Sequence, residues 1–151
     1  MRLSKPHPEL APDPYQILLQ MVRYTRTCGL EHGLLHLVEM RVSQLNGCAF
    51  CLDMHTTDAL RAGEDPRRLA LVAAWRDAPC FTPRERAAFA WAEALTELGR
   101  EAISPELVAA TRVHFDEKAL VDLTHVIALM NTWNRLGVAF HPALPPFEVT
   151  P

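Results

Sequence analysis

Apolar residues recur every three or four positions through the interior of the sequence, as they do on the buried face of an α-helix. The clearest sets are Leu34, Leu37, Val38 and Val42, and Leu120, Leu123, Ile127 and Met130. The interior segments lack the valine and isoleucine alternation that marks a half-buried strand. The pattern therefore predicts an all-α fold, built as a helical bundle.

The breaks between the apolar segments are short and carry helix start and stop signals. Asp13-Pro14, Asp65-Pro66 and Ser104-Pro105 each place a first-turn proline after a capping residue, and Thr82-Pro83-Arg84-Glu85 has the form of a capping box. These signals predict about seven helices. The helices are expected to begin near Asp13, Leu34, Cys48, Asp65, Thr82, Ser104 and Asp116, and the last runs to about Phe140.

The 151 residues have the size of one ordinary domain. We expect a single domain over residues 1–151, with proline-rich extended arms at about 1–13 and 141–151. Lys and Arg total 15 against 18 Asp and Glu and form no basic stripe, so we expect no nucleic acid partner. The apolar runs are shorter than the ~20 residues that cross a bilayer, and no signal peptide pattern precedes them. We therefore expect a cytoplasmic protein with no membrane partner.

The segment from Ser43 to His55 carries the most informative chemistry. Cys48, Cys51 and His55 stand at positions i, i+3 and i+7, so one face of a helix presents all three side chains. A cysteine in the first helical turn meets unpaired N–H groups and the positive end of the helix dipole, which favour the thiolate. His55, one turn beyond Cys51, can accept the proton of its thiol. The two cysteines can also close a disulfide.

Three other interpretations of the cysteine pair remain open. The two cysteines can be buried structural residues, or they can belong to a thioredoxin-type CxxC, although no strand is predicted before Cys48. A structural zinc site needs about four ligands. The sequence has no second CxxC, and Cys28 and Cys80 are isolated, so we expect no metal and no tightly bound cofactor.

The run from His36 to His55, HLVEMRVSQLNGCAFCLDMH, resembles the core of the AhpD-like alkylhydroperoxidases within the carboxymuconolactone decarboxylase superfamily. The stretch Asn131–Arg135, NTWNR, resembles a late helix of the same proteins, and it either positions the cysteine helix or forms a subunit contact. The resemblance implies that Cys51 meets the peroxide, that Cys48 resolves the product, and that His55 assists proton transfer. By helix position alone, Cys48 would be the more reactive thiol, since it lies closer to the helix N-terminus.

One position departs from the family pattern. Twelve residues before Cys48, where the family has a glutamate of its proton relay, this sequence has His36. An imidazole can relay protons, so we expect His36 to take that role, with Glu39 as the alternative one turn along the same helix. The two residues can also be a core histidine and a surface charge without any catalytic part.

These observations together predict a thiol-dependent peroxidase, an antioxidant oxidoreductase of the alkylhydroperoxidase or peroxiredoxin type. Its partners would be a hydroperoxide substrate and a dithiol or thioredoxin-like reductant. The resemblance also implies a homo-oligomer, a trimer or a hexamer. Two alternatives remain: a decarboxylase of the same superfamily, which uses acid and base residues without the cysteine pair, and a non-enzymatic redox sensor or disulfide-relay protein.

Overall fold

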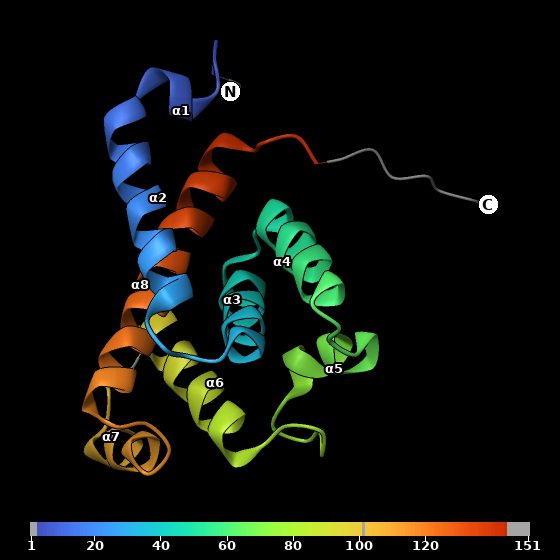
Figure 1. The fold of residues 1–151 in the computed structure, drawn as a ribbon, viewed down its shortest axis with the longest axis vertical. Coiled ribbons are helices and arrows are strands. Elements are labelled where there is room, and N and C mark those ends of the chain that lie inside the picture. Colours follow the sequence, from blue (N-terminus) through green and yellow to red (C-terminus); the bar gives the residue numbers. More distant parts are fainter. Residues whose placement is uncertain (1–2, 101, 145–151) are drawn as a thin grey trace, which may run out of the picture.

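In the computed structural model, which describes residues 3–100 and 102–144, the chain folds as a bundle of helices (Figure 1). The elements are α1 (His7–Leu10), α2 (Pro12–Thr27), α3 (His32–Asn46), α4 (Ala49–Arg61), α5 (Pro66–Leu71), the 3-10 helix η1 (Val72–Ala74), α6 (Pro83–Thr96), α7 (Pro105–Arg112) and α8 (Glu117–Phe140). The described residues include no β-strand. The prediction of an all-α fold is confirmed.

Local capping explains where most of these helices begin. Four of the expected capping side chains accept a hydrogen bond from the first turn of their helix: Asp65, Thr82, Ser104 and Asp116. Thr82 and Glu85 complete the predicted capping box in both directions. The prediction for Asp13 is wrong, because α2 begins at Pro12 and Asp13 lies inside its first turn.

The N-terminal segment is not the extended arm that its prolines suggested. Residues His7–Leu10 form α1, and α2 follows after one intervening residue. Proline is tolerated in the first turn of a helix, where its missing N–H has no intrahelical partner to lose. Residues 141–144 of the predicted C-terminal arm are not helical, and its remaining residues lie outside the described part of the chain.

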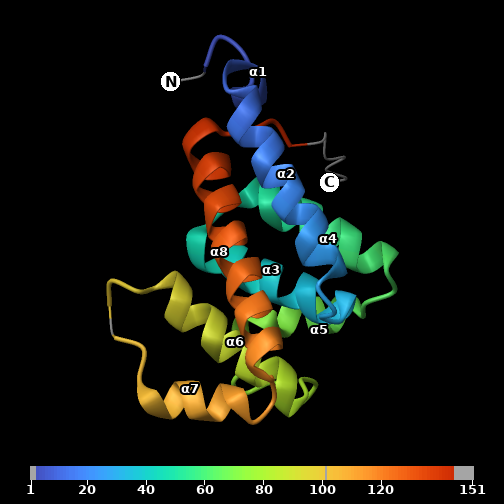
Figure 2. The ribbon, with the colours of Figure 1, turned by 60° about the vertical axis from the view of Figure 1, so that its left-hand side comes forward.

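Helix α3 lies at the centre of the bundle and packs against α4, α6 and α8 (Figure 2). Its apolar residues at helical spacing are fully buried, among them Leu35, Leu37, Val38 and Val42. A second group of buried side chains, which includes Trp75, Phe81 and Phe89, fills the space between α3, η1 and α6. This packing fixes α3, and with it the start of α4.

Helices α2 and α8 run side by side along one flank of the bundle in both views (Figures 1 and 2). Helix α1 lies at the same end of the molecule as the C-terminus of α8, where the His7 ring stacks on Phe140 at 5.3 Å. None of the helices in the described ranges is long and apolar enough to span a membrane.

Candidate active site

The cysteine pair lies at the sharp turn between α3 and α4. Gly47 ends α3 with φ 65° and ψ 33°, a left-handed conformation that a residue without a Cβ adopts at low cost. Cys48 is the N-cap of α4, and its sulfur accepts a hydrogen bond from the Cys51 N–H at 3.3 Å. Cys48 and Cys51 form a disulfide, with their Cα atoms 5.3 Å apart. Both thiols of the reduced protein therefore belong to the first turn of α4.

Asparagines from α8 hold this turn in place. The Asn46 side-chain amide donates to the Oδ1 atoms of Asn131 and Asn134, each at 3.0 Å. Asn134, which is fully buried, donates in turn to the Ser43 hydroxyl at 3.1 Å. Of the two interpretations of the 131–135 stretch, these hydrogen bonds favour positioning of the cysteine helix.

A glycine of α8 makes room for the disulfide. A Cβ atom on Gly137 would lie 2.7 Å from the Cys48 sulfur and 3.4 Å from the Cys51 sulfur. The first distance is shorter than van der Waals contact allows, so only glycine lets the α8 backbone approach this closely. Gly137 was not predicted from the sequence, although a glycine inside a long apolar helix is itself a signal of close packing.

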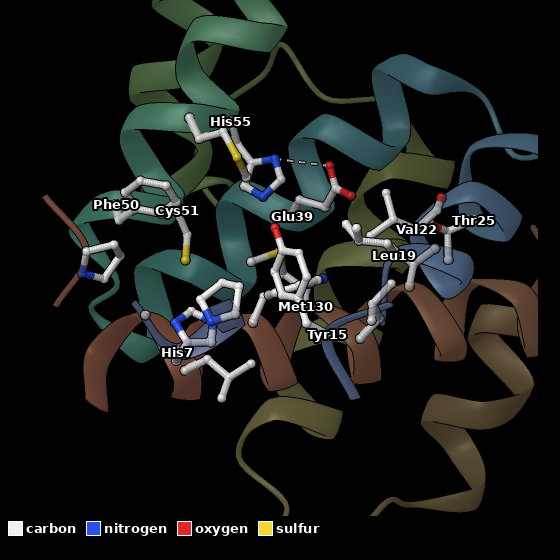
Figure 3. A pocket seen from close by; sticks show the side chains of 18 of the residues that line it. His7, Tyr15, Leu19, Val22, Thr25, Glu39, Phe50, Cys51, His55 and Met130 are labelled. Carbon is white, nitrogen blue, oxygen red and sulfur yellow. Dashed lines mark hydrogen bonds and ion pairs between the residues drawn. The ribbon is translucent and has the colours of Figure 1, made fainter. Parts of the chain in front are cut away.

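Behind Cys51, three helices bring together an imidazole, a carboxylate and a guanidinium. His55 on α4 is buried, and its Nδ1 lies 3.2 Å from Oε2 of Glu39 on α3 (Figure 3). Arg26 on α2 places its Nη2 2.9 Å from the Glu39 carboxylate. Nothing in the local sequence around Arg26 indicated this role, because the contact depends on how α2 packs against α3.

The charges around Glu39 keep it ionised in spite of its burial. Burial by itself raises the pKa of the Glu39 carboxyl. The close contacts of the carboxylate with His55 and Arg26 outweigh burial and hold that pKa below its usual value. At neutral pH the carboxylate therefore bears a full negative charge beside the His55 ring.

His36, expected to be the relay residue, takes a more distant position. Its Nδ1 lies 3.9 Å from Oε2 of Glu39, which is too far for a hydrogen bond. Burial lowers the pKa of His36 below its usual value, and this effect together with Arg26 outweighs the opposing charge of Glu39. His36 is therefore neutral at pH 7. The geometry favours Glu39, the alternative, as the partner of His55.

A cavity of about 450 Å³ opens in front of this group, between α2, α4 and α8 (Figure 3). Its walls are mostly apolar, and they include Leu19, Val22, Phe50, Leu129, Trp133 and Leu136. Cys51, His55 and Glu39 line the cavity, whereas Cys48 and His36 do not. Of the two cysteines, only Cys51 therefore borders the cavity.

The same cluster contains the donor atoms that a metal ion would need. One ligand atom each of His36, Glu39 and His55 lies within 4.8 Å of the others. Arg26, however, already places a positive charge 2.9 Å from the carboxylate, and this charge repels a cation from the only anionic ligand of the set. We therefore interpret the cluster as a hydrogen-bonded charge network.

Comparison with known proteins identifies the family of the chain. Residues 12–94, more than half of the chain, match the carboxymuconolactone decarboxylase family. The uncharacterized protein YdfG of Bacillus subtilis is 38% identical over 131 residues, which cover 87% of this chain and 89% of YdfG.

Two solved structures are similar to the whole bundle. ATU0492 of Agrobacterium tumefaciens, a protein of unknown function with a suggested role as the antioxidant defence protein AhpD, has a TM-score of 0.91 at 32% identity over 97% of this chain and 99% of its own. The debrominase Bmp8 has a TM-score of 0.80 at 18% identity, over 89% of this chain and 72% of its own, which shows a common fold alone. The resemblance noted in the sequence is confirmed: the chain is AhpD-like and belongs to the carboxymuconolactone decarboxylase family.

Proposed function

We propose that the protein is a thiol-dependent peroxidase in which Cys51 attacks a hydroperoxide and Cys48 resolves the product. The observation that carries the proposal is the difference between the two cysteines: Cys51 lines the cavity and Cys48 does not. Both sulfurs lie near the N-terminus of α4, where the helix dipole stabilises a thiolate. Access from the cavity therefore supports Cys51 as the residue of the first step.

The proposed reaction begins when an external dithiol reduces the Cys48–Cys51 disulfide. The Cys51 thiolate then attacks the terminal oxygen of the hydroperoxide, the O–O bond breaks, and the leaving alkoxide takes up a proton to become an alcohol. Cys48 next gives up its thiol proton and attacks the Cys51 sulfenic acid, the S–O bond breaks, and the departing hydroxide takes up that proton and leaves as water while the disulfide forms again. In each cycle the hydroperoxide gains two electrons and the dithiol loses two.

His55 supplies the proton transfers in this scheme. It follows Cys51 by one helical turn, so it can take the thiol proton and later return it to the leaving oxygen. Its Nδ1 lies 3.2 Å from Glu39 as an ion pair, and neither ring nitrogen has a hydrogen-bond partner in the described structure, so Nε2, on the far side from Glu39, is free for proton exchange. Glu39 and Arg26 then act as positioning residues that fix the orientation of the ring.

The reductant and the location follow from the same chemistry. A disulfide that must be reopened in every cycle needs a dithiol or a thioredoxin-like protein, and such reductants are maintained in the cytoplasm. We therefore place the protein in the cytoplasm with a reductant of this class.

Turnover by the purified protein tests the proposal. Peroxide consumption is measured with cumene hydroperoxide and with hydrogen peroxide, in the presence of dithiothreitol or a thioredoxin system. We expect turnover by the wild type, loss of turnover in Cys51→Ser and Cys48→Ser, and no loss in the matched control Cys80→Ser, whose half-buried thiol lies outside the cavity.

Other outcomes of this assay identify the alternatives. Decarboxylation of a lactone acid that survives replacement of both cysteines would overturn the proposal in favour of a decarboxylase. Reversible disulfide formation with a negligible peroxide rate would overturn it in favour of a redox sensor or disulfide relay.

A further inference from the structure

A tyrosine forms part of the cavity wall opposite the cysteine helix. Tyr15 lies in the first half of α2 and lines the cavity together with Cys51 and His55. Figure 3 shows its hydroxyl pointing into the cavity, on the side where His55 and Glu39 lie. Tyr15 could not be predicted from the sequence, because only the packing of α2 against the site brings it there.

Aromatic neighbours hold the ring of Tyr15 in this orientation. Trp133 meets the ring edge-on, with centroids 5.7 Å apart and planes at 81°. His7 does the same from α1, at 6.1 Å and 78°. Because these contacts are made by the ring, the direction of the hydroxyl does not depend on a hydrogen bond of its own.

The Tyr15 hydroxyl donates no hydrogen bond to any of the residues that the structure describes. In the other tyrosine, Tyr24, the hydroxyl donates to Asp122 at 2.7 Å. No interaction reaches the Tyr15 hydroxyl from any side chain drawn in Figure 3. Of the other polar groups in the cavity wall, the Thr25 hydroxyl donates to the Val22 carbonyl and Arg26 Nη2 donates to Glu39. Arg26 Nη1 and the Nε2 atoms of His7 and His55 have no partner among the described residues, but each belongs to a side chain that is held by the ion pair with Glu39 or by ring stacking.

Cleavage of a peroxide bond creates a need for such a donor. As the O–O bond breaks, negative charge develops on the leaving oxygen, and an apolar cavity offers little water to solvate it. We propose that Tyr15 is a catalytic residue whose O–H donates a hydrogen bond to the leaving oxygen of the hydroperoxide. Tyr15 keeps its proton. The proton that completes the alcohol is the one that His55 took from the Cys51 thiol, so the step converts thiol and hydroperoxide into sulfenic acid and alcohol.

The proposal rests on the peroxidase function, and its test uses two reagents for the same thiol. In fully reduced protein, the rate constant of Cys51 oxidation by cumene hydroperoxide is compared with the rate constant of its alkylation by iodoacetamide. Alkylation expels iodide, which needs no proton and gains little from a hydrogen bond. Tyr15→Phe removes the hydroxyl and keeps the ring with its contacts to Trp133 and His7.

We expect Tyr15→Phe to slow the peroxide reaction by about 10²-fold, as removal of one donor to a developing oxyanion does, and to leave alkylation unchanged. The matched control is Tyr24→Phe, the same deletion on the same helix but outside the cavity, which should leave both rates unchanged. Hydroperoxides whose alcohols are weaker acids should lose the most rate in Tyr15→Phe, because their leaving oxygens need the donor most.

Two results would overturn the assignment of Tyr15. Equal losses in both reactions would mean that Tyr15 acts on the thiol or on packing, and unchanged rates in both would mean that it plays no part. If the wild type itself is alkylated normally but reacts with no hydroperoxide, the proposed function fails and the assignment fails with it. An active wild type beside an equally active Tyr15→Phe variant refutes the tyrosine alone.

Discussion

Replacement of Glu39 by glutamine separates the role of the buried carboxylate from the role of His36. Glu39→Gln keeps the shape of the side chain and removes its charge, 3.2 Å from the Nδ1 of His55. At that distance, with an effective dielectric constant of about 20, a carboxylate stabilises an imidazolium by about 5 kcal/mol. The glutamine oxygen still accepts a hydrogen bond, so we expect about half of this stabilisation to remain.

A loss of about 2.7 kcal/mol in the transition state corresponds to a decrease of about 10²-fold in rate. We therefore expect Glu39→Gln to slow oxidation of Cys51 by about that factor. His36→Gln should change the rate by less than about threefold, because His36 is neutral at pH 7, lies 3.9 Å from the carboxylate and is not part of the cavity wall.

The assay is stopped-flow oxidation of the fully reduced protein by a hydroperoxide at several pH values, with melting temperatures measured in parallel. Equal melting temperatures exclude a packing defect as the cause of a slow variant. A wild-type rate in Glu39→Gln together with a 10²-fold loss in His36→Gln would refute the reasoning. It would mean that the relay follows the family position and not the geometry around His55.

Three further predictions follow from the fold and its charges. Gly137→Ala should destabilise the oxidised protein by about 1–3 kcal/mol in urea unfolding, because the added Cβ would lie 2.7 Å from a disulfide sulfur. The control Gly33→Ala should not destabilise it, because a Cβ at Gly33 meets no atom within 4 Å. The folded-state pKa of Glu39 lies below the usual 4.5, so the ionised carboxylate stabilises the fold fully above pH 4.5 and loses this effect as the pH falls through the folded-state pKa. The difference in free energy of unfolding between the wild type and Glu39→Gln should therefore shrink over this acid range. A difference that stays constant would contradict this prediction. Apolar side chains are exposed on α2 and α8, among them Ile17 with 60% of its surface, and we expect a homo-oligomer to cover them. Sedimentation should therefore give a multiple of 17.0 kDa, and a mass of 17.0 kDa at micromolar concentration would refute the homo-oligomer.

Features that depend on neighbours in the sequence could be predicted well. The caps at Asp65, Thr82, Ser104 and Asp116 satisfy N–H groups within three residues, so the local sequence contains all the information that they need. The relative position of Cys51 and His55 could be predicted for the same reason, because both residues lie on one helix. Asp13 was the exception, since prolines on both sides of it let the helix begin earlier.

Features that depend on the packing of separate helices could not be predicted. Arg26 and Tyr15 come to the site from α2, which no local pattern relates to α4. Which of His36 and Glu39 contacts His55 also depends on the packing of separate helices. Both lie on α3 one turn apart, and only the rotation of α3 against α4 decides which of them meets His55.

The central claim is that Cys51 receives the oxygen of the peroxide and Cys48 resolves it. The most direct measurement is mass spectrometry of Cys48→Ser and Cys51→Ser after one equivalent of hydroperoxide, with dimedone present to trap sulfenic acid. We predict a dimedone adduct on Cys51 in Cys48→Ser and none on Cys48 in Cys51→Ser, because Cys51 lines the cavity and Cys48 does not. An adduct on Cys48 in Cys51→Ser, with Cys51 unlabelled in the other variant, would contradict the account and reverse the two roles.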